Sequence, residues 1–360
     1  MEVFDDFGRP CGKRFSVYVN CRQKFVQKSV VDRFRFYRSF SSSSVMNLAL
    51  KNVTVVGSGL MGSGIAQVAA QTGHNVTLVD VSEPILEKAH SRIQKSLERV
   101  AKKKFSDNAQ ESEKFIKETL QKLKTTTSPS DSVKEADIVI EAIVENMKVK
   151  HELFKTLDKA APKSTIFSSN TSSLSITEIA SVTQRKDRFG GLHFFNPVPV
   201  MKLLEVIRTE ETSDDTYNKL MNFGKELGKT TITCKDTPGF VVNRLLVPYM
   251  GEAVRMLERG DATARDIDTA MKLGAGYPMG PFELLDYVGL DTTLFILEGW
   301  HEKYPENPLF QPSEMLKKLV SEGKLGMKTG EGMAAISPVP RQHAYRDMPK
   351  TFAPLPATEI

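Results

Sequence analysis

The sequence predicts an α/β fold, a doubly wound and mostly parallel sheet, followed by an all-α domain. Up to about residue 235, short β-branched runs alternate with amphipathic helical stretches, which is typical of parallel sheets flanked by helices. After Asp236-Thr237-Pro238-Gly239 the segments keep a helical period and no strand is apparent. We therefore expect a sheet domain over residues 47–235 and a helical domain over residues 236–332.

The individual elements follow from the local pattern. Apolar, β-branched runs predict strands at 52–56, 75–79, 137–142, 165–168, 189–195, 203–207 and 230–234. Helical periodicity predicts helices at 65–70, 148–161, 243–259, 264–273, 281–297 and 313–322. Residues 85–124 are helical and charged, and Ser106-Asp107-Asn108 predicts a turn between two antiparallel helices there. The first strand, helix and second strand form one βαβ unit.

The two ends of the chain differ from its body. Residues 1–46 hold nine Lys or Arg and four acids, whereas the remainder holds 40 residues of each sign. The Arg-, Lys-, Ser- and Phe-rich stretch over 13–45 is typical of a mitochondrial transit peptide. The acids within the first dozen residues fit this poorly, so a disordered tail or an alternative start is the other interpretation. Residues 333–360 hold five prolines and little periodicity, and we expect them to be disordered.

Composition also limits the partners. The formally neutral body argues against a nucleic-acid partner, because polyanion-binding proteins need a basic surface. No apolar stretch approaches the ~18 residues of a membrane span. Cys234 is the only cysteine outside the leader, which fits a reducing compartment such as the mitochondrial matrix. This cysteine has no metal-site spacing, so we expect an inert thiol and no metal.

A glycine-rich turn predicts the cofactor site. The segment Gly57-Ser58-Gly59-Leu60-Met61-Gly62 lies between a predicted strand and a predicted helix, the context that a dinucleotide fingerprint requires. In a Rossmann-type fold Gly57 permits the tight turn, Gly59 lets the backbone approach a pyrophosphate, and Gly62 lets the helix pack on the strand. The helix N-terminus then favours the phosphate charge.

Asp80 selects among the dinucleotides. It ends the second strand, about 20 residues after the turn, where a carboxylate accepts hydrogen bonds from the adenosine ribose hydroxyls. The next residues, Val81-Ser82-Glu83, offer no arginine for a 2′-phosphate, which Asp80 would repel. The sequence therefore predicts NAD rather than NADP. FAD, which uses the same turn, is the alternative cofactor.

His193 and Glu205 are the candidate acid–base pair. They lie twelve residues apart in a segment that otherwise reads apolar. Histidine has an ordinary pKa suited to taking a proton near pH 7, and a carboxylate partner can orient the ring and stabilise the imidazolium that forms. A structural histidine and an acid at a strand edge are the alternatives.

Several motifs in order resemble the short-chain L-3-hydroxyacyl-CoA dehydrogenases of mitochondrial β-oxidation. They are Gly57-x-Gly59-x-x-Gly62, 141–146 (EAIVEN), 169–174 (SNTSSL), His193 to Glu205, 235–244 (KDTPGFVVNR) and 276–283 (GYPMGPFE). The resemblance covers about residues 48–332. It implies that NAD⁺ oxidises the 3-hydroxyl of an (S)-3-hydroxyacyl-CoA to a 3-oxoacyl-CoA.

The resemblance also implies roles for individual residues. His193 would be the general base on the 3-hydroxyl proton, and Glu205 would bind its other ring nitrogen. Ser172 and Asn243 would contact the substrate near the reacting oxygen. The implied NAD contacts are Ser172, Asn196, which meets the nicotinamide end, Glu145, Lys150 and Lys328. Ser96 and Lys103 would contact coenzyme A.

The residues themselves leave alternatives open for these roles. Lys102-Lys103-Lys104 is a local cation cluster in a neutral body, suited to the CoA phosphates, or else a solvated helix face. Ser172 follows a strand, where ligands bind in open α/β sheets, but a structural Ser/Thr turn is also possible. Asn243 would equally cap the first helix of the helical domain.

Oligomeric state and activity complete the expectations. The family implies a homodimer through the helical domain, and its apolar helix faces fit either a dimer or a monomer core. A non-catalytic, crystallin-like NAD-binding relative and a sugar- or gulonate-type dehydrogenase are the alternatives to the enzyme. After Gly326–Gly332 the family's aromatic and basic end is replaced by Met333 and a Pro-rich extension, so we expect weaker packing there.

Overall fold

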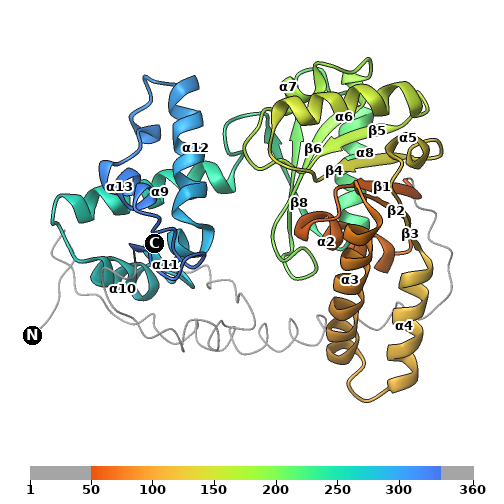
Figure 1. The fold of residues 1–360 in the computed structure, drawn as a ribbon, viewed down its shortest axis with the longest axis horizontal. Helices are drawn as coiled ribbons and strands as arrows, with labels where there is room; N and C mark the ends of the chain where they lie inside the picture. The colour runs from red at the N-terminus through yellow and green to blue at the C-terminus, as the bar shows by residue number, and fades with distance from the viewer. Residues whose placement is uncertain (1–49, 334–360) are drawn as a thin grey trace, which may run out of the picture. The chain divides into compact units, whose positions relative to one another are not determined.

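The structure is a computed structural model that describes residues 50–333 (Figure 1). The expected leader over 1–46 and nearly all of the expected tail lie outside the described residues. Within the described range, no helix is both long enough and apolar enough to cross a bilayer.

The sheet has eight strands in the order β3-β2-β1-β4-β5-β6-β7-β8. Their bounds are β1 Asn52–Val56, β2 Asn75–Val79, β3 Leu123–Thr126, β4 Ile138–Glu141, β5 Ile166–Ser169, β6 Phe189–Phe194, β7 Leu203–Arg208 and β8 Thr230–Lys235. All neighbouring pairs are parallel except β6 and β7, which are antiparallel. The predicted doubly wound, mostly parallel sheet is therefore confirmed.

Helices cover the sheet and extend beyond it. They are α2 Leu60–Gln71, α3 Glu83–Lys104, α4 Ala109–Gln121, α5 Pro129–Ser132, α6 Met147–Ala160, α7 Ile176–Ala180 and α8 Asp214–Glu226, with a 3₁₀ turn at Lys186–Arg188. Helices α3 and α4 lie side by side as a hairpin that projects from the sheet (Figure 1). Apolar residues fill both faces of the sheet, since alternate strand residues belong to two separate clusters, one containing Val55 and the other Val56.

The sequence pattern does not capture every element of this domain. The predicted hairpin over 85–124 includes the start of β3, an edge strand whose two central residues are exposed, so it shows no apolar run. Helix α8 was not predicted; it is amphipathic, and Ser213 caps it by accepting a hydrogen bond from the Thr216 amide.

The helical domain contains α9 Val242–Glu258, α10 Ala264–Gly274, α11 Pro281–Val288, α12 Leu290–Lys303 and α13 Glu314–Ser321, with a 3₁₀ turn at Pro308–Phe310. The single helix predicted over 281–297 is wrong, because Gly289 has a φ of 101° and separates α11 from α12. Met333 is fully buried in the core of this domain, and its amide donates to Asp286 Oδ1 at 2.7 Å.

Candidate functional site

The glycine turn joins β1 to α2. Gly57 has a φ of 99°, and a Cβ there would lie 2.4 Å from the Ala142 carbonyl oxygen. A Cβ on Gly62 would lie 1.7 Å from the carbonyl oxygen of Gly57. At Gly59, by contrast, a Cβ would meet nothing within 4 Å, and no side chain caps the start of α2 there. The turn therefore has one open side, at which the amides of Leu60 and Met61 begin the helix, and this suits a pyrophosphate.

Asp80 lies beside this turn at the end of β2. Its Oδ2 accepts hydrogen bonds from the amide and the hydroxyl of Ser58, both at 2.7 Å, and its Oδ1 accepts one from the Val81 amide. Although partial burial opposes the shift, these hydrogen bonds hold the pKa of Asp80 below its usual value. The structure thus brings together the turn and an ionised carboxylate, the two groups that the sequence assigned to a dinucleotide.

His193 and Glu205 face each other across the antiparallel pair β6 and β7, as partners in the strand register. The distance from His193 Nδ1 to Glu205 Oε2 is 2.6 Å. Glu205 is fully buried and His193 is 5% exposed. The Oε1 atom of Glu205 accepts hydrogen bonds from the amides of Val241 and Val242, where α9 begins. The carboxylate therefore binds the imidazole on one side and the start of the helical domain on the other.

Two aromatic rings lie against the imidazole. The Phe195 ring centroid lies 4.5 Å from that of His193, and the Phe240 centroid lies 5.6 Å from it. Phe240 is the one non-glycine residue with positive φ, 54°, among those described. A strained backbone conformation of this kind persists only where the surrounding structure requires it. At Phe240 it places the ring beside His193 while the next two amides, of Val241 and Val242, bind Glu205.

A buried polar network holds the loop that carries Ser172. Lys150 Nζ lies 2.6 Å from Glu141 Oε1 and 3.1 Å from Glu145 Oε2, with the lysine side chain 1% exposed. Glu145 Oε1 accepts hydrogen bonds from the Thr171 hydroxyl and, at 3.3 Å, from the Ser172 amide. Burial works against ionisation, but the Lys150 charge and nearby hydroxyls hold the pKa of Glu145 below its usual value.

Ser172 is fixed by its backbone. Its amide binds Glu145 and its carbonyl accepts a hydrogen bond from Asn243 Nδ2 at 3.3 Å. Within residues 50–333 the Ser172 hydroxyl has no hydrogen-bond partner. Asn243 lies in the first turn of α9, close to the two amides that hold Glu205. The structure thus links four predicted residues, His193, Glu205, Ser172 and Asn243, through α9.

The other predicted residues lie in three places. Asn196 is exposed in the loop after β6, and Lys229 holds this loop by donating to the carbonyl oxygens of Val198 and Met201. Ser96 and Lys103 lie on α3, within the projecting hairpin. Lys328 lies in the helical domain, where its ammonium binds Asp291 and Thr292 rather than the glycine turn.

The structure also separates the three neighbouring lysines of α3. Lys104 Nζ lies 5.2 Å from the ring centroid of Phe105 and 5.0 Å from that of Phe115. Lys102 and Lys103 are exposed.

The Cys234 thiol is buried, and burial together with the charge of Glu205 raises its pKa to about 11, so it stays protonated at neutral pH.

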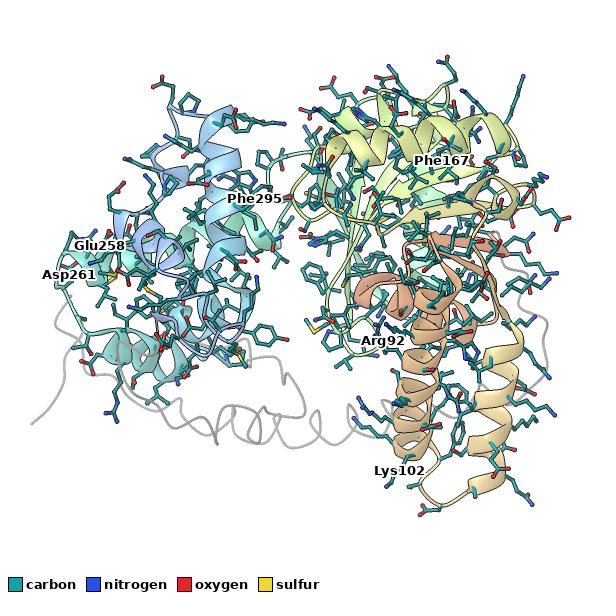
Figure 2. The ribbon with its side chains drawn as sticks, in the orientation of Figure 1. Arg92, Lys102, Phe167, Glu258, Asp261 and Phe295 are labelled. Carbon is teal, nitrogen blue, oxygen red and sulfur yellow. The ribbon has the colours of Figure 1, made fainter. Side chains whose placement is uncertain are left out.

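Sequence reasoning missed Arg92. From α3 its Nη1 donates to the Ser58 carbonyl oxygen at 3.2 Å and to Ser63 Oγ at 2.9 Å. Arg92 lies at the end of α3 nearer the sheet, whereas Lys102 lies near the tip of the hairpin (Figure 2). Only the packing of the hairpin against the glycine turn shows this contact, because Arg92 lies 34 residues beyond Ser58 in the sequence.

Two family models match consecutive parts of this chain. Residues 52–237 match the family model "3-hydroxyacyl-CoA dehydrogenase, NAD binding domain", and residues 239–336 match "3-hydroxyacyl-CoA dehydrogenase, C-terminal domain". The chain is 62% identical over 303 residues to human mitochondrial hydroxyacyl-coenzyme A dehydrogenase, covering 83% of this chain and 96% of that protein. It is 59% identical over 283 residues to a probable 3-hydroxyacyl-CoA dehydrogenase of Caenorhabditis elegans, covering 79% and 92%.

A solved structure agrees in fold as well as in sequence. The crystal structure of (S)-3-hydroxybutyryl-CoA dehydrogenase from Ralstonia eutropha has a TM-score of 0.75 and 43% sequence identity to this chain. The match covers 79% of this chain and 98% of that chain. The similarity therefore extends over the sheet domain and the helical domain alike.

Proposed function

The chain belongs to the 3-hydroxyacyl-CoA dehydrogenase family and is an NAD-dependent dehydrogenase, and we propose that it oxidises (S)-3-hydroxyacyl-CoA to 3-oxoacyl-CoA with His193 as the base. The observation that carries this proposal is the buried contact of 2.6 Å between His193 Nδ1 and Glu205 Oε2. It commits one ring nitrogen to the carboxylate, so Nε2 is the atom left to accept a proton.

The proton transfer follows from this pairing. His193 Nδ1–H donates to Glu205, and Nε2 takes the proton of the substrate 3-hydroxyl as the C–H bond at C3 breaks. When bound, NAD⁺ supplies the hydride acceptor. The positive charge that develops on the imidazole is stabilised by Glu205, whose own negative charge is stabilised by the amides of Val241 and Val242.

Ser172 and Asn243 position the reacting oxygen. We assign the free hydroxyl of Ser172 to a hydrogen bond with the substrate oxygen. The same residue would also contact the coenzyme. Asn243 reaches the same oxygen from α9 while its side chain steadies the Ser172 carbonyl. Two donors aimed at that oxygen bind the 3-hydroxyl in the orientation that hands its proton to His193.

The coenzyme site fits NAD on its own geometry. The open side of the turn at Gly59 admits a pyrophosphate to the backbone of residues 57–62, and the ionised Asp80 accepts from ribose hydroxyls. Glu145, with its side chain 31% exposed, contacts the coenzyme directly, and the buried Lys150 holds Glu145 in place through their ion pair. Asn196 binds the nicotinamide end, and Lys328 would join this site only by leaving Asp291 and Thr292.

The α3–α4 hairpin is the proposed coenzyme A site. Ser96 and Lys103 lie on one side of α3, and Lys103 is exposed and carries no ion pair within residues 50–333. Lys102 is a weaker candidate, and Lys104 is already held by two aromatic rings.

We place this activity in fatty acid β-oxidation in the mitochondrial matrix, as a homodimer. The human, rat and mouse relatives are named mitochondrial, and the basic leader agrees with import. Exposed apolar side chains on the helical domain, such as Leu273 at 83% and Tyr277 at 45%, support a second copy as partner.

NADH-dependent reduction of acetoacetyl-CoA by the purified chain tests this function. We expect robust turnover. A crystallin-like relative would bind NADH and leave acetoacetyl-CoA unreduced, and a sugar-type dehydrogenase would oxidise a sugar acid instead; either result would contradict the proposal.

A further inference from the structure

Arg92 lies at the edge of the glycine turn, and one of the three nitrogens of its guanidinium is bound by the protein. Its Nη1 binds the Ser58 carbonyl oxygen and Ser63 Oγ, and Ser63 itself donates to the same carbonyl at 2.7 Å. Ser58 and Ser63 are almost fully buried, at 1% and 2% exposure, whereas Arg92 is exposed. The side chain is therefore anchored at one nitrogen, with Nε and Nη2 left at the surface.

The charge of Arg92 is not neutralised by the protein. Within residues 50–333 it forms no ion pair, although Ser58 joins it to Asp80: the Ser58 carbonyl accepts from Arg92, and the Ser58 amide and hydroxyl donate to Asp80. An arginine held in a fixed orientation without a carboxylate partner presents the planar fork that binds phosphate. We expect Asp80 to bind the adenosine ribose of the coenzyme, so Nε and Nη2 of Arg92 would lie near that ribose.

The helix face that carries Arg92 also carries other polar and basic side chains. Arg92, Ser96, Arg99 and Lys103 recur at spacings of four, three and four residues, which places them on one side of α3 over about 16 Å. The buried side of α3 is made by Leu86, Ala89, Ile93, Leu97 and Ala101, so this polar stripe flanks the core. Arg92 is the end of the stripe that meets the glycine turn (Figure 2).

We propose that Arg92, supported by Ser58 and Ser63, is a binding site for a ribose phosphomonoester at the edge of the nucleotide turn. Two ligands carry that group: coenzyme A, as its 3′-phosphate, and NADP, as its 2′-phosphate. The polar stripe, with its three cations, favours coenzyme A. Asp80 argues against NADP, because its carboxylate would repel a phosphate on the coenzyme's own ribose. In this form the inference rests on the proposed acyl-CoA activity.

Binding measurements on the full chain separate these sources without using turnover. We would titrate wild type and Arg92→Gln with adenosine 3′,5′-bisphosphate and with ADP, and separately with NADP⁺ and with NAD⁺. Wild type should prefer the bisphosphate to ADP, and Arg92→Gln should lose that preference by about tenfold while its affinity for NAD⁺ stays within about twofold. Arg92→Lys should recover only part of it, since a lysine lacks the fork. Lys114→Gln, which removes one exposed charge from α4, should behave as wild type.

Each outcome decides the question. If Arg92→Gln loses the preference for the bisphosphate, the ligand is the 3′-phosphate of coenzyme A. If it loses only affinity for NADP⁺, the ligand is the 2′-phosphate of NADP. Either result supports the phosphomonoester site. If Arg92→Gln weakens ADP, NAD⁺ and the bisphosphate equally, or changes none of them, Arg92 only buttresses the turn and the inference is wrong. Acetoacetyl-CoA reduction by wild type is scored separately, so failure of the activity and failure of this site are distinguishable.

Discussion

Glu205 binds His193 through one carboxylate oxygen and the first amides of α9 through the other. The Oε2 atom lies 2.6 Å from His193 Nδ1, and Oε1 lies 2.9 Å from the Val242 amide. Because α9 begins the helical domain, the orientation of the base depends on both domains. The first turn of α9 has no side-chain cap of its own, and the carboxylate fills that place while the helix dipole favours its charge.

The glycine turn gives a prediction with an internal control. Gly59→Ala should fold with an unchanged melting temperature, because its Cβ meets no protein atom within 4 Å and its backbone, at φ −60°, accepts alanine. The added methyl should nevertheless raise the Kd for NADH, since it occupies the side from which the pyrophosphate approaches. Gly62→Ala should lose much of its stability, because its Cβ would lie 1.7 Å from the Gly57 carbonyl oxygen. Thermal denaturation and NADH titration of both variants check this; equal behaviour of the two would contradict it.

Ser172 should contribute to turnover without contributing to stability. Its hydroxyl has no partner in the described structure, while its amide and carbonyl hold the loop. Ser172→Ala should lower kcat/KM about 10- to 100-fold, as expected for a lost hydrogen bond to a developing charge, with the melting temperature unchanged. In Ser173→Ala the hydroxyl removed already binds Glu145 at 3.1 Å, so we expect a smaller kinetic loss and a measurable loss of stability. Reversal of these two patterns would show that Ser172 is structural.

Lys150 should be essential for stability. It is buried with Glu141, and removing one partner leaves a buried charge unpaired. Lys150→Met should lower the free energy of unfolding by about 3–5 kcal/mol. Lys155→Met breaks an exposed pair with Glu152 on the same helix and should leave stability almost unchanged, because solvent screens that pair. Urea denaturation measures both; a cost for Lys150→Met as small as for Lys155→Met would refute the buried network as a support of the loop.

Asp268 should make stability fall as pH rises through the weakly acidic range. Burial raises its pKa to about 6, with Glu283 adding to the effect, although the amides of Phe282 and Glu283 and the charge of Lys272 oppose it. A carboxyl whose pKa is higher in the folded state loses its proton first in the unfolded chain, so ionisation favours unfolding. Between pH 4 and about 6, wild type should therefore lose stability relative to Asp268→Asn, and the difference should level off above that window. Denaturant unfolding at several pH values gives the two curves, and parallel curves would contradict this.

The sequence was sufficient for features set by local pattern. Gly57, Gly62 and Asp80 were recognisable because a strand, a turn and a helix follow one another within 30 residues, and the structure places them as that order predicts. His193 and Glu205 were paired from their spacing, and the register of β6 and β7 sets them opposite each other. Their catalytic roles stay a proposal.

Tertiary contacts were beyond the sequence. The amides of α9 that bind Glu205 lie more than 30 residues downstream, and nothing in their sequence marks them as partners. Strand β3 carries no apolar run because it lies at the sheet edge, and Gly289 interrupts a helix pattern that is continuous in apolar residues. Arg92 reaches the glycine turn only through the packing of α3, and Lys328 is taken up by Asp291 in the helical domain.

The most direct test of the account is turnover by His193→Gln, measured as NADH-dependent reduction of acetoacetyl-CoA beside NADH binding by the same preparation. Glutamine keeps a polar side chain within reach of Glu205 but cannot exchange a proton near neutral pH. If His193 is the base, kcat should fall by about 10²- to 10⁴-fold while the Kd for NADH stays within about twofold of wild type. A variant that binds NADH normally and keeps most of its kcat would show that another group handles the proton of the 3-hydroxyl.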